Sequence, residues 1–491
     1  MSRMRMSFYL LALVCLLVAS ASKWKLDGQA PQSRVTVFEG ARLIKGDGSA
    51  PIENSAFVVT GDKFTQVGRR GELQAPAGAA HVDLTGKTVM PALIDIHGHF
   101  GFQHIVEGTM SKSFFTRENL IDHLQRLAYS GVGAVVGVGD LEDRSDMHGG
   151  RTNWGDVPLQ LRKEVIPNAA LFRTAGTGIA WPGSGPQGDP SRVDVPYPVT
   201  TPEEARKAVD DYVKMKPEFI KIWVDDRGGT KKTLTPPLYR AIAEEAHKYN
   251  VPVGVHNVTL ADAKELMRDG VEGWLHVPVR GGDAADNELI GIVKQRVAQN
   301  NRAKMWMTPA LISAWMDNQG GTRPAWLDEP LLRDLYSSEQ IEEYWGRPLA
   351  KRTPEEVKRA RQDFALQASN AMKLRAAGMR VVGGTDTGQT RFFIGYFNHL
   401  DLESTVAMGL TPSEAITAAT RDAADIAHVN AGLVAQGKSA DFIVLDANPL
   451  EKIGNTRRIT EVYLRGQKVD RAALKAKWSA ERNRRTTSSL K

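Results

Sequence analysis

Residues 91–99 read Pro-Ala-Leu-Ile-Asp-Ile-His-Gly-His, a short apolar run that ends in two histidines. The run of Leu93, Ile94 and Ile96 is typical of a strand buried on both faces. Residues two apart on a strand point to the same side, so His97 and His99 project together. Two imidazoles that converge at a strand end supply half of a metal site. Two unrelated surface histidines are the alternative interpretation, and the rest of the chain decides between them.

From Pro91 onward, short apolar runs alternate with amphipathic helical stretches, which indicates βα units and a parallel sheet. Thr201-Pro-Glu-Glu begins one helix with an N-cap, a proline and early acids, and Thr411-Pro-Ser-Glu repeats the device. The sequence predicts an α/β protein with a (β/α)8 TIM barrel over 91–431, whose active site lies at the carboxyl ends of the strands. The expected strands are 93–97, 134–138, 169–173, 219–224, 251–256, 273–277, 304–307 and 379–383.

The two ends of the chain read differently from its middle. Residues 34–90 form short strand patterns punctuated by glycines, and residues 432–470 return to strand and turn patterns. We expect these segments to make one small β-sandwich domain from both chain ends. The tail, 471–491, is basic and polar, and a loosely attached helix or disorder is expected there.

The first 21 residues have the pattern of a secretory signal peptide. Arg3 and Arg5 precede an apolar run over 8–18, which Ala-Ser-Ala follows. The run is short for spanning a bilayer, so no permanent membrane anchor is expected after cleavage. The chain's single cysteine, Cys15, lies in this segment, and a mature chain would hold any metal through nitrogen and oxygen alone. An exported protein, periplasmic or secreted, is therefore predicted.

The charge of the chain limits which classes of molecule it is expected to bind. The net charge of +6 is modest for 491 residues, and basic residues are dispersed apart from a cluster in the last twenty. This distribution lacks a nucleic-acid footprint and favours a small-molecule substrate. The chain could also form a homo-oligomer.

Six residues lie in or just after the expected barrel strands, where all of them can face one mouth of the barrel. A single histidine near a strand end is more often a core residue than a ligand, and an aspartate after Gly-Gly-Thr could simply cap a helix. A lysine in a central parallel strand is harder to dismiss, because lysine is almost never buried without a partner. All six at the correct strand ends favour a common site: His97, His99, Lys221, His256, His276 and Asp386.

The stretch 91–99, the strand lysine, the two later histidines and Gly384-Thr385-Asp386 together resemble the metal-dependent amidohydrolase superfamily. The segments 411–415 and 437–450 extend the resemblance over nearly everything after the signal peptide. The chain is most similar to the imidazolonepropionase-related and prolidase-like subgroup with a carboxylated lysine. Several members of this subgroup cleave amide bonds to amino acids.

The resemblance implies a ligand set for two divalent metal ions, typically zinc. His97, His99 and Asp386 would bind one ion, and His256 and His276 would bind the other. Lys221 would join them as a carbamate derived from carbon dioxide. Two such ions lower the pKa of a shared water and polarise a substrate carbonyl.

The implied function is that of an exported binuclear zinc hydrolase that cleaves an amide bond by metal-activated hydroxide. The substrate could be peptide-like, an N-acyl amino acid or a cyclic amide. Asp386 would act as the catalytic residue, first as base and then as acid. An esterase, lactonase or phosphotriesterase on the same site is the alternative, and a catalytically inactive binding barrel is another. Deaminases of the superfamily normally carry a glutamate after strand five, where this chain has His256-Asn257.

Further residues are candidates for orienting ligands or contacting substrate. Asp95 shares the parity of His97 and could orient a ligand or serve structure alone. His104 is the second candidate for proton transfer. Long loops after the strands contain Trp181, and strand four contains Trp223. The insertion 309–352, with Trp315 and four other aromatic residues at 326, 336, 344 and 345, is expected to form part of the substrate pocket or to pack on the barrel.

Overall fold

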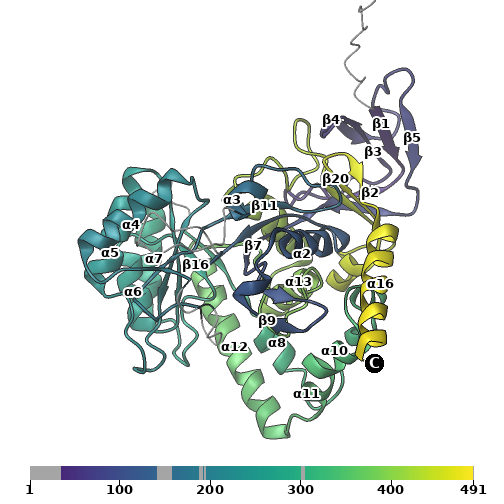
Figure 1. Cartoon of the computed structure of the whole chain (residues 1–491). Helices are drawn as coiled ribbons and strands as arrows, with labels where there is room; N and C mark the ends of the chain where they lie inside the picture. Colours follow the sequence, from purple (N-terminus) through teal and green to yellow (C-terminus); the bar gives the residue numbers. More distant parts are fainter. Residues whose placement is uncertain (1–34, 141–156, 187–191, 193–194, 300–304, 490–491) are drawn as a thin grey trace, which may run out of the picture.

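The computed structural model describes residues 35–140, 157–186, 192, 195–299 and 305–489. Within these residues, short parallel strands alternate with helices that lie outside them (Figure 1), which confirms the α/β class. Each of the eight expected strands is present and overlaps its predicted range. They are β7 (Leu93–Gly98), β10 (Val132–Gly137), β11 (Leu171–Thr174), β14 (Ile220–Val224), β15 (Val253–Asn257), β16 (Gly273–Leu275), β17 (Trp306–Thr308) and β18 (Arg380–Val381).

The eight strands lie in two parallel sheets. Their orders are β11-β10-β7 and β13-β12-β14-β15-β16-β17-β18, where β12 (Ile179–Ala180) and β13 (Tyr197–Pro198) are short additions. The backbone N–H of Ile96 donates to Gly383 O at 3.2 Å, which joins β7 to the chain after β18. At the other junction, Glu218 N–H donates to Thr174 O at 3.3 Å. One continuous closed sheet is not observed among the described residues, so closure of the predicted barrel stays a prediction.

Side chains from both sheets meet in one apolar interior. Ile94 and Ile96 of β7 pack there with Val136 of β10. Phe219 and Trp306 come from the second sheet, and their ring centroids lie 5.5 Å apart. An interior filled by branched and aromatic side chains is the packing expected of a small barrel rather than of a pore.

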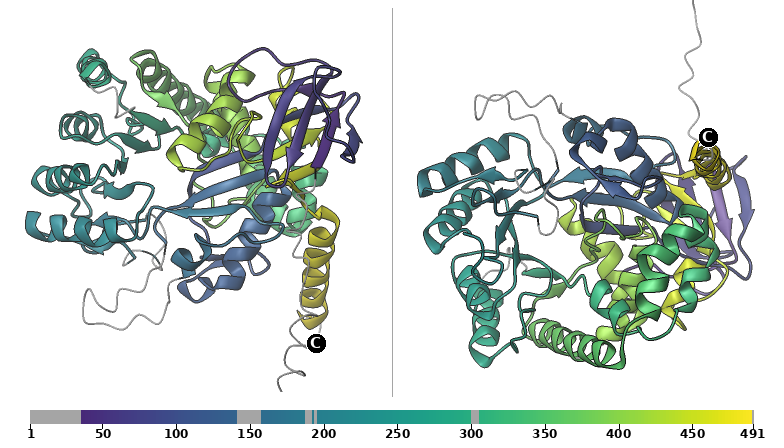
Figure 2. Two further views of the ribbon diagram at one scale, coloured as in Figure 1. Left: turned by 90° about the horizontal axis from the view of Figure 1, so that it is seen from above. Right: turned by 60° about the horizontal axis from the view of Figure 1, so that its bottom comes forward.

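Helices surround the strands, as the right view of Figure 2 shows. Helix α4 begins at the predicted Thr201, which forms a capping box with Glu204, and α14 begins at Thr411 with the same device. The helices outside the barrel strands are α2 (Arg117–Tyr129), α3 (Val157–Leu161), α4 (Pro202–Lys214), α5 (Pro236–Lys248), α6 (Leu260–Arg268), α7 (Asn287–Gln299), α12 (Pro354–Ala376), α13 (Phe397–Met408), α14 (Pro412–Thr417) and α15 (Ala423–Ile426).

Strands from both chain ends pair beside the barrel (Figure 1). Strand β6 (Thr88–Pro91) pairs antiparallel with β19 (Phe442–Leu445), and Phe38 lies 5.0 Å from Phe57 and 5.1 Å from Phe442 between ring centroids. The residue limits 34–90 and 432–470 of a β-sandwich domain stay a prediction. The remaining strands here are β1 (Val35–Glu39), β2 (Arg42–Leu43), β3 (Ser55–Thr60), β4 (Lys63–Arg69), β5 (Ala80–Asp83), β20 (Ile459–Leu464) and β21 (Gln467–Lys468).

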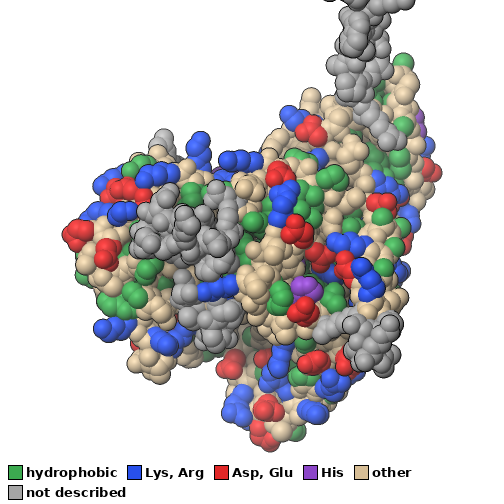
Figure 3. Space-filling model, in the orientation of Figure 1, with side chains coloured by type: hydrophobic (Ala, Val, Ile, Leu, Met, Phe, Trp, Pro, Cys, Tyr) green, Lys and Arg blue, Asp and Glu red, His purple; other side chains and the backbone are tan. Residues whose placement is uncertain are grey.

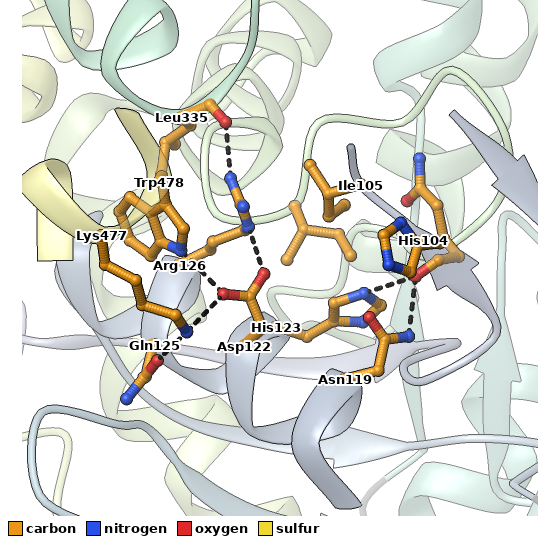
Figure 4. Close-up of polar contacts among 12 residues, drawn as sticks. His104, Ile105, Asn119, Asp122, His123, Gln125, Arg126, Leu335, Lys477 and Trp478 are labelled. Carbon is orange, nitrogen blue, oxygen red and sulfur yellow. Dashed lines mark hydrogen bonds and ion pairs between the residues drawn. The ribbon is translucent and has the colours of Figure 1, made fainter. Parts of the chain in front are cut away.

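The C-terminal helix α16 (Arg471–Ser489) is docked on α2, so the expectation of a loose tail is wrong. Trp478 is 0% exposed, and its Nε1–H donates to Asp122 Oδ1 at 2.7 Å (Figure 4). Arg126 donates from Nε to the other oxygen of Asp122 at 2.7 Å and lies 4.6 Å from the centroid of the Trp478 ring. A buried aromatic ring and a shared carboxylate hold a helix whose remaining residues are mostly polar.

The surface in Figure 3 shows Lys, Arg, Asp and Glu side chains interspersed on this face. Among the residues that the structure describes, no helix is both long enough and apolar enough to span a bilayer. The predicted signal peptide, 1–21, lies outside the described residues.

Candidate metal centre

The six residues predicted from the strand ends lie in or just after parallel strands, and their role as metal ligands stays a prediction. His97 lies in β7, Lys221 in β14 and His256 in β15. His276 follows β16 directly, and Asp386 lies on the loop after β18. The parallel register places the ends of these strands at one edge, which is why residues far apart in sequence meet.

The tightest group consists of His97, His99 and Asp386. Their ligand atoms all lie within 4.8 Å of one another, a spacing that could hold a metal ion. Asp386 Oδ1 is 3.0 Å from His99 Nε2 and 3.4 Å from His97 Nε2. The other ring nitrogen of His99 lies 2.5 Å from the carbonyl oxygen of Val138. With Nδ1–H donating to this carbonyl, Nε2 faces Asp386 and can serve as a ligand once it has lost its proton.

Two further histidines extend this group. His276 Nε2 is 3.9 Å from Asp386 Oδ2. The His276 ring centroid lies 5.1 Å from that of His97 and 5.0 Å from that of His256. Asp386 therefore faces both halves of the predicted ligand set.

The backbone is strained at two of these residues. His276 has φ 144° and Asp386 has φ 59°, conformations that side-chain-bearing residues adopt rarely. The loop carrying Asp386 also runs so close to β7 that a Cβ on Gly388 would lie 1.8 Å from His99 O. Such strain persists only where the surroundings hold it, and here it aims two polar side chains at one point.

Lys221 is 1% exposed in the middle of its strand. Burial lowers the pKa of its amine well below the ordinary value; Asp386 opposes this effect and Arg280 adds to it. Its Nζ lies 5.0 Å from the ring centroid of Trp223. A neutral amine is the form that can add carbon dioxide, so the surroundings suit the predicted carbamate.

The protonation of the other groups suits metal binding. Burial lowers the pKa of His97 and His276 well below its ordinary value, which keeps both imidazoles neutral. Burial alone would raise the pKa of Asp386, but His97, His99 and His276 together hold it well below its usual range. Neutral imidazoles beside an ionised carboxylate form a nitrogen and oxygen donor set that fits a divalent transition metal.

Asp95 is not one of the candidate ligands, but it forms hydrogen bonds with the segments that carry His97 and Asp386. Its Oδ1 accepts from the backbone N–H of His97 at 3.0 Å and of Thr385 at 3.1 Å. Its Oδ2 accepts from Thr385 Oγ1 at 2.6 Å and Asn398 Nδ2 at 2.9 Å. Asp95 thus ties β7 to the loop that ends at Asp386.

Three other predicted residues lie outside the group formed by His97, His99 and Asp386. His104, in the short β8 (Gln103–His104), accepts from Glu107 N–H at 3.2 Å and lies 5.1 Å from the Phe114 ring between centroids. The ring centroid of Trp181 lies 5.4 Å from Lys232 Nζ. Trp223 packs so tightly on Gly178 that a Cβ there would lie 2.2 Å from its ring, which makes Trp223 a wall beside Lys221.

The aromatic residues of the insertion 309–352 pack on the barrel. Trp315 and Trp345 pack against the large core cluster around α13. Trp326 is 7% exposed and stacks on Tyr396 with 6.0 Å between ring centroids. The packing alternative therefore describes these side chains. The insertion's short helices are α8 (Ile312–Asp317), α9 (Pro330–Leu335), α10 (Ser338–Ile341) and α11 (Arg347–Ala350).

A cavity of about 490 Å³ opens beside the candidate ligands His276 and Asp386. The insertion contributes only small residues to its wall: Ala310, Ser313 and Ala314. The cavity is also lined by charged residues that the sequence analysis did not identify, namely Asp225, Arg227 and Arg280. Asp225 follows β14 directly, so the rule that found His276 could have found it.

Asp225 and Arg280 both contact His256. Asp225 Oδ2 lies 3.1 Å from His256 Nε2, and Arg280 Nη2 lies 3.0 Å from the same nitrogen. Burial, followed by Arg280, lowers the pKa of His256 to about 3. A second ion on His256 Nε2 would need the space next to it, so Arg280 would have to give up this contact.

Two more buried charges lie near His99. Asp140, which comes shortly after β10, accepts from Thr174 Oγ1 at 2.5 Å, and burial raises its pKa to about 7. Arg192 is buried and near enough to lower the pKa of both Asp140 and His99. Asp140 could have been found as a polar residue at a strand end; Arg192 comes from a long loop that gives no such signal.

Comparison with known proteins agrees with this geometry. The family described as "Amidohydrolase family" matches residues 88–469. A search of curated proteins finds no significant match. A structure from Bifidobacterium longum, provisionally described as a prolidase, is 26% identical, with a TM-score of 0.65 over 90% of this chain and 98% of that chain.

Two further solved structures show the same fold at lower identity. A Xaa-Pro dipeptidase with bound methionine in its active site is 21% identical, with a TM-score of 0.63 over 88% of this chain and 99% of that one. The ochratoxinase of A. niger is 18% identical, with a TM-score of 0.63 over 89% of this chain and 96% of that one. These likenesses confirm an α/β fold of the TIM-barrel type.

Proposed function

Because the chain belongs to the amidohydrolase family and is a hydrolase of carbon–nitrogen bonds, we propose that it cleaves an amide bond at a binuclear zinc centre. The bond would be peptide-like, that of an N-acyl amino acid or that of a cyclic amide. The observation that carries this proposal is the convergence of Asp386 with His97, His99 and His276 at the strand ends. The prolidase and dipeptidase names among the similar structures support an amino acid on one side of the bond.

The residues present fit divalent ions. His97, His99 and Asp386 would hold one ion, and His256 and His276 would hold another. Lys221 would bridge them as a carbamate, and the lowered pKa of its buried amine favours this reaction. When bound, two ions would lower the pKa of a water molecule and polarise the substrate carbonyl.

Asp386 is the residue best placed to move the proton. Its carboxylate faces three imidazoles, which hold its pKa low and keep it ionised at neutral pH, the form that can accept a proton. Amide cleavage needs one proton removed from the attacking water and one delivered to the leaving nitrogen. A single carboxylate that lines the cavity can perform both transfers in turn.

Asp95 and Trp223 support this arrangement, and neither lines the cavity beside Asp386. Asp95 fixes the distance between β7 and the loop of Asp386 through four hydrogen bonds. Trp223 lies against Gly178 and Lys221 and keeps water from that side of the amine. Water exclusion strengthens every charge interaction in the site.

A substrate panel tests the function directly. Zinc-loaded protein is offered Xaa-Pro dipeptides, N-acetyl amino acids, cyclic amides, lactones, carboxylic esters and a phosphotriester, and kcat/KM is compared. We expect the highest values among the amides of amino acids. Faster cleavage of lactones, esters or phosphotriesters would favour the alternative hydrolase, and no turnover of any class would favour a binding barrel.

We also propose that residues 1–21 direct export and that the mature protein works outside the cytoplasm. Support comes from the basic start, the apolar run and the small residues that follow it. Fractionation of expressing cells, with mass determination of the purified chain, tests this proposal. Recovery of the full-length chain from the cytoplasm alone would contradict it.

A further inference from the structure

Two guanidinium groups line the cavity beside Asp386, and they differ in how their charge is balanced. Arg227 contacts Asp225 Oδ2 through Nη1 and donates from Nη2 to Gly185 O at 2.6 Å. Its backbone N–H also donates to Asp225 Oδ1 at 2.9 Å. The charge of Arg227 is therefore neutralised by a carboxylate that is already in place.

Arg280 has only neutral hydrogen-bond partners. Its Nη2 lies 3.0 Å from His256 Nε2, and its Nε donates to Asn257 O at 3.4 Å. Among the described residues, it forms no ion pair with a carboxylate. Burial lowers the pKa of Arg280, while Asp386 and Asp225 raise it from a longer distance. An arginine stays charged in proteins, so this side chain is a cation without a contacting anion.

The position of Arg280 allows its unpaired charge to contact a bound substrate. The residue follows β16 by a few positions and shares the cavity wall with His276 and Asp386. A substrate whose reacting bond lies at Asp386 would place its neighbouring groups within the same cavity. A guanidinium presents two parallel N–H donors that match a carboxylate, and the match is strongest where water is excluded.

Resting on the proposed function, we propose that Arg280 binds the free carboxylate of the substrate. The enzyme would then prefer amides whose amine half is an amino acid with an unblocked carboxyl group, such as an N-acyl amino acid or a dipeptide. A neutral amide or carbamate would leave the guanidinium unpaired and would be cleaved poorly. Arg280 is a specificity residue in this account, and it takes no part in proton transfer.

The purely structural alternative is that Arg280 only orients His256. In that case its removal would slow all substrates equally. Carboxylate recognition instead predicts a loss confined to acids and expressed mainly in KM, because the contact would be the same in the bound substrate and in the transition state.

The kinetic test compares N-acetyl-L-proline and N-acetyl-L-methionine with their carboxamides, in which the carboxylate is replaced by a neutral group. For the wild-type protein we expect kcat/KM to be about 100-fold higher for the acids, the usual size of a lost buried charge contact. Arg280→Met should abolish this preference, and Arg280→Lys should keep about a tenth of it. Arg227→Met is the matched control from the same cavity and should change the preference less than about threefold.

A binding measurement separates this proposal from the proposed function. Chelator-treated protein is titrated with the same four compounds by calorimetry, so that no turnover occurs. Binding of the acids to the wild-type protein and to Arg227→Met, but not to Arg280→Met, supports the carboxylate site even if no amide is hydrolysed. Equal binding of acid and carboxamide, no binding of either, or an unchanged preference in Arg280→Met and Arg280→Lys would overturn it.

Discussion

Asp95 offers a sharp test, because its replacement by asparagine keeps the shape of the side chain and changes only its hydrogen bonding. Four donors converge on its two oxygens, two on each. An amide offers one acceptor oxygen, so two buried donors would face an NH2 group. Each buried donor left without a partner costs about 1–3 kcal/mol, and Asp95→Asn should lower the free energy of unfolding by about 2–6 kcal/mol.

A neighbouring buried aspartate is the matched control. Burial, together with the nearby Asp95 carboxylate, raises the pKa of Asp401 well above its usual range, which favours the neutral form of its carboxyl group. A neutral amide replaces a neutral carboxyl group at little cost, and Asp401→Asn should change stability by less than about 1 kcal/mol. The two substitutions are chemically identical, and the structure predicts opposite outcomes.

The assay has two readouts. Urea unfolding of metal-free protein gives the stability difference, and competition with a chelator gives the zinc affinity. Because Asp95 holds β7 against the loop of Asp386, we expect Asp95→Asn to weaken zinc binding about 10- to 100-fold, and Asp401→Asn to leave it nearly unchanged. Wild-type stability and zinc affinity in Asp95→Asn, or equal damage by both substitutions, would refute the positioning role.

Three further predictions concern Lys221, Asp386 and Asp122. Lys221→Ala should lower activity about 100-fold and be partly rescued by short-chain carboxylic acids, whereas Lys221→Arg should not be rescued; steady-state rates with added acid decide this. Asp386→Asn should lower kcat by about two to four orders of magnitude while most zinc stays bound, as rate and metal assays will show. The pKa of Asp122 is lowered by Arg126 and Lys477 against the opposing effect of burial, so its stabilisation is complete above about pH 4 and is lost as the pH falls further. Urea unfolding measured at pH 7 and at pH 3 gives the free energy of unfolding at each pH. This free energy should fall more between pH 7 and pH 3 for the wild-type protein than for Asp122→Asn.

Much of the site could be predicted because its polar residues come at the ends of short apolar runs in the sequence. His97, His256 and His276 each lie at or just after such a run, and parallel strands bring those points to one edge. Lys221 was recognisable because a lysine inside a buried strand needs a special reason. The parity of Asp95 predicted its link to His97, although the contact is with the backbone of His97 rather than with its ring.

Other features depend on packing that sequence pattern does not encode. Arg280 lies on a loop after His276, and only the folded chain shows its side chain turning back to His256. The aromatic residues of 309–352 suited either a pocket or a core, and Trp326 lies in the core. For the C-terminal helix a signal was present, because Leu474 and Trp478 are four residues apart on an otherwise polar stretch, and both are buried.

We propose that two metal ions, held by both halves of the ligand set, make this chain an amide hydrolase. The most direct test is a zinc titration of chelator-treated protein, with hydrolysis of the best amide from the panel followed at each step. We expect activity to rise to its full value as two equivalents of zinc per chain are bound, and His97→Ala and His256→Ala each to bind fewer. Full activity in the metal-free protein, or undiminished zinc binding and rate in both variants, would contradict it.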